Sequence, residues 1–61
     1  MTKLVGREIK VKRGRLVENM IISEITQIVP NVFSVSGTNS KRKIVVTMME
    51  DEILENLLGG N

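Results

Sequence analysis

Two architectures are open to this chain of 61 residues, and the segment that separates them reads LVENMIISEITQIV, at residues 16–29. Apolar residues recur in it at helical spacing, at Val17, Ile21, Ile25 and Ile28. The same segment also alternates, and it is rich in Ile and Val, whose branched side chains lose rotamer freedom in helices and suit strands. We therefore expect one long, bent strand, and a helix is the alternative.

The preceding segment predicts a half-buried strand that ends in a turn. In GREIKVKR, at residues 6–13, Ile9 and Val11 alternate with Lys10 and Lys12, which is the two-residue period of a strand. The two apolar side chains then point into the core and the two lysines into water. The sequence RGR at residues 13–15 predicts a tight turn, because its central glycine readily adopts a positive φ.

The segment that follows predicts a hairpin. Pro30 indicates a break, since the residue before a proline is pushed out of the helical region. Val32–Ser36 predicts a short strand, and the composition of Gly37–Ser40 is typical of a loop. The apolar runs Phe33–Val35 and Ile44–Val46 flank this loop, so we expect them to pair.

A short C-terminal helix is predicted at residues 48–58. Thr47 and Glu50 have the spacing of a capping box, in which the hydroxyl and the carboxylate each accept a hydrogen bond from a free backbone N–H. The acids at residues 50–52 lie in the first turn, where the helix dipole favours negative charge. Gly59-Gly60 is a suitable stop.

The order of these segments resembles that of the Veg family of small bacterial proteins, which adopt an SH3-like barrel. The matching pieces are GREIKVKRGR at Gly6–Arg15, the step Ile22–Glu24, PNVFSV at Pro30–Val35, and KIVVTMMEDEIL at Lys43–Leu54. The resemblance implies a small barrel with a regulatory or binding role, and it brings no catalytic residues. We therefore expect one mainly β domain over residues 1–61, an SH3-like barrel of four or five strands with a short C-terminal helix. The alternative, with residues 16–29 helical, is a βαββα fold like a winged helix.

The composition argues against several classes of function. The chain has no Cys and no His, and so lacks thiolate metal ligands, the commonest metal ligand and the usual general base near neutral pH. We expect no metal, no other cofactor and no enzymatic activity. Small domains without disulfides or metals often gain stability by oligomerising, so a homodimer is a fair expectation. No apolar run resembles a signal peptide or approaches the ~20 residues of a membrane span, which favours a cytoplasmic protein.

The charge is divided along the chain and points to an anionic partner. All nine Lys and Arg residues lie in the first 43 positions, with Glu8, Glu18 and Glu24 as the only acids there, for a net +6. Residues 44–61 carry four acids and no base, for a net −4. Two clusters of basic residues are the candidates for nucleic-acid binding, and they would form one surface if the two loops lie at one end of the fold. These residues are Lys10, Lys12, Arg13, Arg15, Lys41, Arg42 and Lys43. The alternative for these bases is a solvated surface that keeps strand edges from pairing.

A second candidate surface is apolar and belongs to the C-terminal helix. Its residues would dock a protein partner or a second copy, or else close the end of the barrel: Met48, Met49, Ile53, Leu54, Leu57 and Leu58. Phe33 is the only aromatic residue and is expected in the core, so base stacking has little support. The leading hypothesis is a small regulatory protein of gene expression that binds DNA or structured RNA through its basic strand and loops. The alternative is an adaptor or homo-oligomerising module that uses the helix.

Overall fold

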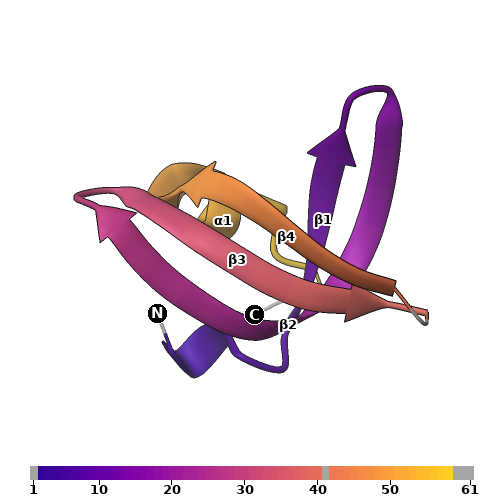
Figure 1. Ribbon diagram of the computed structural model, residues 1–61, viewed down its shortest axis with the longest axis horizontal. Coiled ribbons are helices and arrows are strands. Elements are labelled where there is room, and N and C mark those ends of the chain that lie inside the picture. The colour runs from indigo at the N-terminus through magenta and orange to yellow at the C-terminus, as the bar shows by residue number, and fades with distance from the viewer. Residues whose placement is uncertain (1, 41, 59–61) are drawn as a thin grey trace.

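The fold is built on one antiparallel sheet of four strands in the order β1-β2-β3-β4 (Figure 1). The computed structural model describes residues 2–40 and 42–58. Its elements are the 3-10 helix η1 (Thr2–Leu4), the strands β1 (Glu8–Arg13), β2 (Leu16–Val29), β3 (Val32–Asn39) and β4 (Arg42–Met49), and the helix α1 (Glu50–Asn56). The predicted mainly β fold with a short C-terminal helix is confirmed. The helical alternative for residues 16–29, with its βαββα fold, is wrong.

Strand β2 is long because it belongs to both halves of the sheet. Its residues up to Ile21 pair with β1, and those from Ile21 onward pair with β3. Between Ile22 and Glu24 the register with β3 shifts and leaves Ser23 as the extra residue of a bulge. The Ser23 hydroxyl donates a hydrogen bond to the Ser36 carbonyl at 3.2 Å. Because bulges bend a strand and increase its twist, β2 curves and the sheet takes a barrel-like shape, as Figure 1 shows.

The strands are joined by tight connections, and the one between β3 and β4 is shorter than predicted. Gly14 has the positive φ expected at the β1–β2 turn, and Asn31 has φ 69 after Pro30, as at the third position of a type II turn. The predicted loop over Gly37–Ser40 is wrong for its first three residues, because β3 continues to Asn39 and pairs with β4 as far as Arg42. Cross-strand pairing here outweighs the turn-like composition. Lys41 lies outside the described residues.

The core lies on the inner side of the curved sheet and under α1. Ile9 and Val11 are buried while Lys10 and Lys12 are exposed, so the alternation predicted for β1 is confirmed. Phe33 is in the core, as expected. The remaining buried apolar residues come from β2, β3, β4 and α1: Met20, Ile22, Val35, Ile44, Met48 and Ile53.

Helix α1 begins and ends two residues away from the predicted limits. Thr47 lies in β4, and the N-cap is Met49, whose N–H donates to Glu52 Oε1 at 3.0 Å. The capping pair predicted at Thr47 and Glu50 is therefore wrong by two positions, because Met49 still pairs with Val32 as the last residue of β4.

The chain leaves α1 to lie along β1. Leu57 forms an isolated antiparallel bridge with Ile9, and the Leu58 N–H donates to the Glu8 carbonyl at 2.8 Å. This short contact stands in the place of a fifth strand, and it explains why the helix ends at Asn56 rather than at residue 58. The predicted stop at Gly59-Gly60 lies outside the described residues.

Candidate nucleic-acid interface

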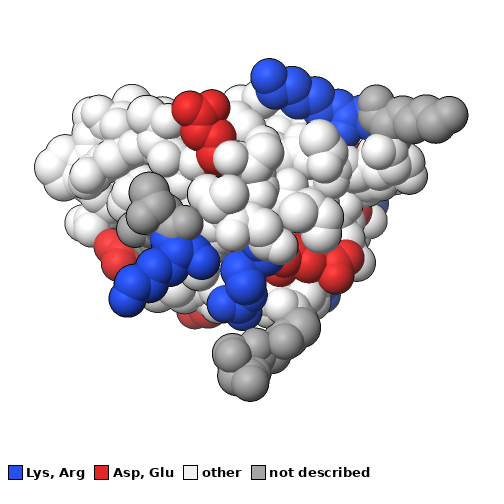
Figure 2. All heavy atoms as spheres, turned by 90° about the horizontal axis from the view of Figure 1, so that it is seen from below, with Lys and Arg blue, Asp and Glu red and all other residues white. Residues whose placement is uncertain are grey.

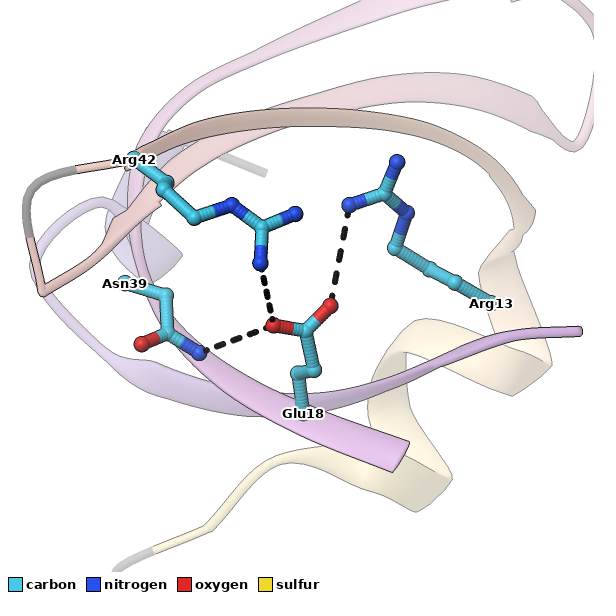
Figure 3. A network of polar contacts seen from close by, with 4 residues as sticks. All are labelled: Arg13, Glu18, Asn39 and Arg42. Atoms are coloured by element: carbon cyan, nitrogen blue, oxygen red, sulfur yellow. Dashed lines mark hydrogen bonds and ion pairs between the residues drawn. The ribbon is translucent and has the colours of Figure 1, made fainter. Parts of the chain in front are cut away.

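The two hairpins bring basic residues together at one end of the barrel. Arg13 is the last residue of β1 and Arg42 the first residue of β4, and both contact Glu18 of β2 (Figure 3). One residue of each basic cluster, Arg13 and Arg42, therefore reaches the same carboxylate.

Glu18 is the centre of this cluster. Its Oε1 accepts hydrogen bonds from Arg42 Nη1 at 3.3 Å and from Asn39 Nδ2 at 3.5 Å. Its Oε2 lies 3.6 Å from Arg13 Nη1. The Glu18 side chain is 14% exposed, whereas the side chains of Arg13 and Arg42 are 43% and 58% exposed. The carboxylate thus lies beneath the two guanidinium groups, which face the solvent.

The period of the strands explains why these side chains meet. Glu18 pairs with Val11, whose side chain is buried, so Glu18 points to the inner side of the sheet. Arg13 is two residues beyond Val11 and points the same way. Asn39 and Arg42 are a cross-strand pair of β3 and β4. All four side chains therefore converge at the mouth of the barrel, where the core ends.

The cluster carries one positive charge in excess and has hydrogen-bond donors to spare. Two guanidinium groups face one carboxylate, and each guanidinium has more N–H groups than its contact with Glu18 uses. A planar guanidinium held in one orientation is well suited to binding a phosphate group through two parallel hydrogen bonds. The cluster can therefore bind an anion that approaches from solvent.

The other predicted bases surround this cluster unevenly. Arg15 is exposed in the β1–β2 turn and Lys43 is exposed on β4, beside Arg42. Lys10 and Lys12 line a groove of about 360 Å³ between β1, β4 and α1, and Glu52 and Glu55 line it as well. Acids of the helix therefore offset part of the charge of these two lysines. Lys41 lies outside the described residues.

The face seen in Figure 2 carries no single basic patch. Basic and acidic residues are scattered over it, and most of the surface between them is uncharged. The concentration of positive charge that the sequence suggests is therefore not found on this face.

Two members of the cluster, Glu18 and Asn39, were not predicted from the sequence. One signal could have found Glu18. In a strand over residues 16–29, the row that contains Met20 and Ile22 also contains Glu18, so an acid occupies a position of the apolar face. A charged side chain on the apolar face of a strand needs a partner of opposite charge. Basic residues at the ends of the two neighbouring hairpins can supply it. Asn39 had no such signal, because it was expected in a loop.

The apolar residues of the second candidate surface are mostly turned inward. Met48 and Ile53 are buried in the core, and Leu57 packs against it. Leu58 is partly buried, and Met49 and Leu54 are exposed. Helix α1 therefore covers the core, and only two of the six residues offer a large side-chain surface to a partner.

Neither helix in residues 2–40 and 42–58 has the length and apolar character needed to cross a membrane. Over the same residues, no three His, Cys, Asp or Glu side chains are grouped so that they could hold a metal ion. Comparison of the chain with known protein families, with curated proteins and with solved structures finds no match. The resemblance to the Veg family therefore stays a prediction.

Proposed function

We propose that this is a small, non-catalytic regulatory protein that binds nucleic acid at the hairpin end of the barrel. The observation that supports this most is the convergence of Arg13 and Arg42, from two different hairpins, on the largely buried carboxylate of Glu18. Arg15, in the turn after β1, and Lys43, next to Arg42 in the sequence, are exposed and add positive charge to the two hairpins.

The proposed contacts are to phosphate groups rather than to bases. Proteins that bind splayed bases stack them on aromatic side chains, and the one aromatic residue, Phe33, is buried. Contacts to phosphate release counterions, so they give an affinity that depends little on sequence and falls steeply with salt. A duplex or a structured RNA, with regularly spaced phosphates, fits such a surface.

The test is a titration of labelled duplex DNA and of a labelled RNA hairpin at two salt concentrations, followed by fluorescence anisotropy. We expect binding at low salt and a steep loss at high salt. Arg15→Ala, at the exposed turn, should weaken binding to every sequence and flatten the slope of log K against log salt by about one unit.

The matched control is Lys3→Ala, which removes the same charge from an exposed site in η1, beside the middle of β2 in Figure 1. It should leave the salt slope unchanged. An equal effect of the two variants would mean that binding follows net charge alone. Affinity weaker than about 10⁻⁴ M at low salt, the weak limit of ordinary nonspecific binding, would rule the proposal out.

A further inference from the structure

The two edge strands of the sheet are protected to very different degrees. Strand β1 carries Glu8, Lys10 and Lys12, and the bridge from Leu57 to Ile9 occupies part of its outer edge. Strand β4 has no charged residue from Ile44 to Met49, and in the described part of the chain it pairs with β3 alone. Natural edges usually carry charges, prolines or bulges that prevent pairing with another chain. Strand β4 lacks all three over these six residues.

The middle of this edge is open to solvent. Val45 is 59% exposed on the outer face of β4. Val46 and Thr47 line the groove at the free edge of β4, and residues of β1 and α1 form its other walls. An added strand could therefore reach the backbone of β4 at this point.

The charges on the two sides of the uncharged segment Ile44–Met49 are opposite in sign. They would therefore match those of a second copy that runs antiparallel to it. Arg42 and Lys43 precede it, and Glu50 and Asp51 follow it. The Glu50 N–H donates to the Asn31 carbonyl at 3.1 Å, so the chain stays in line with β4 up to this first acid. An antiparallel copy brings bases opposite acids at both ends, whereas a parallel copy brings like charges together.

We propose that a second copy of this chain pairs antiparallel with β4, around a twofold axis at Val46, and that two sheets of four strands become one of eight. In this register Val46 faces Val46 of the second copy and Arg42 faces Glu50 of the second copy. Each residue faces one whose number in the second copy differs from its own by an even number. The inner and outer faces of the two sheets are therefore continuous across the contact. The contact is isologous, which closes the assembly at a dimer.

A second copy is the occupant that the charges favour over a foreign strand. In the register centred on Val46, Arg42 of each copy lies opposite Glu50 of the other, so one strand supplies both halves of the charge match. A small domain without disulfides also gains stability from such a contact. The test of this inference is separate from that of the proposed nucleic-acid binding, because the dimer is measured in the absence of nucleic acid; Arg42 belongs to both surfaces.

Sedimentation equilibrium over a range of protein concentrations tests the dimer. We expect the unmodified chain to dimerise and Val45→Lys to raise the dimer dissociation constant at least about tenfold, because it brings two lysines close together diagonally across the axis. Val17→Lys is the matched control, since Val17 is 56% exposed but lies in the first half of β2, which pairs with β1 and is not part of the proposed contact. It should leave the dissociation constant unchanged. Circular dichroism checks that both variants are folded.

Cross-linking tests the register, and the absence of native cysteine makes the result clear. Val46→Cys should form an intermolecular disulfide rapidly under mild oxidation, since directly opposed residues of antiparallel strands lie about 4.5–5.5 Å apart between Cα atoms. Val17→Cys should not. A chain that stays monomeric up to about 1 mM, equal effects of the two lysine variants, or association only with a foreign protein would each overturn the proposal.

Discussion

At the scale of the residue, Gly37 determines how closely β3 passes β2. A Cβ atom at this position would lie 2.5 Å from the Ile21 carbonyl oxygen and 2.8 Å from Met20 Sδ. The first of these atoms belongs to the backbone, which cannot move aside as a side chain can. The composition of Gly37–Ser40 suggested a loop, but this glycine is needed for a close approach between strands and not for a turn.

Gly37→Ala should therefore lower the free energy of unfolding by about 2–3 kcal/mol, the cost of overpacking a well-filled site. Gly14→Ala is the comparison, because a Cβ there meets nothing within 4 Å and only the positive φ of 64° opposes it. Its cost should be about 1 kcal/mol. Urea denaturation of the three proteins measures both values. If Gly37→Ala cost no more than Gly14→Ala, β2 and β3 would have room to move apart.

At the scale of the element, the alternation and the branched residues of β2 were sufficient to predict a strand, but not its bulge. The position of Ser23 as the extra residue depends on how Ile22 and Glu24 pair with β3, and no local pattern contains that information. The start of α1 was missed for a similar reason. Thr47 is a good N-cap by type, yet it pairs with Ser34 in the sheet. Pairing between distant residues decided both boundaries.

The attachment of α1 to the barrel depends on one buried side chain. Ile53 is fully buried, whereas its neighbour Leu54 is about half exposed. Ile53→Ala should cost about 3 kcal/mol in unfolding free energy, since it leaves a cavity in the core. Leu54→Ala should change it by less than about 0.5 kcal/mol, as is usual at the surface. Thermal or urea unfolding of this pair tests the contact, and similar losses would mean that the helix is not packed as described.

At the scale of the whole molecule, the Glu18 cluster ties together all four strands. It joins the end of β1, the first half of β2, the end of β3 and the start of β4 (Figure 3). The sequence indicated the basic residues of this site through their clustering, whereas the only signal for the carboxylate was the place of Glu18 in the apolar row of Met20 and Ile22. Which acid lies between two hairpin ends depends on the bend of β2, which is a property of the folded sheet.

This arrangement predicts that stability and nucleic-acid binding change in opposite directions in Glu18→Gln. The amide oxygen can still accept a hydrogen bond from a guanidinium group, but the ion pairs are lost. Because both arginines are substantially exposed, we expect a loss of only about 1 kcal/mol of unfolding free energy. At the same time one negative charge disappears from the centre of the proposed phosphate site, and affinity for duplex DNA at low salt should rise several-fold.

Glu24→Gln is the matched control for this prediction, because it removes an equal charge from an exposed position of the same strand. It should change neither unfolding nor binding by a comparable amount. Urea denaturation measures the change in unfolding free energy, and anisotropy titration of the same protein samples measures the change in affinity for duplex DNA. A fall in the affinity of Glu18→Gln would contradict the prediction. The orientation that the full carboxylate gives to Arg13 and Arg42 would then matter more to the site than the charge that it cancels.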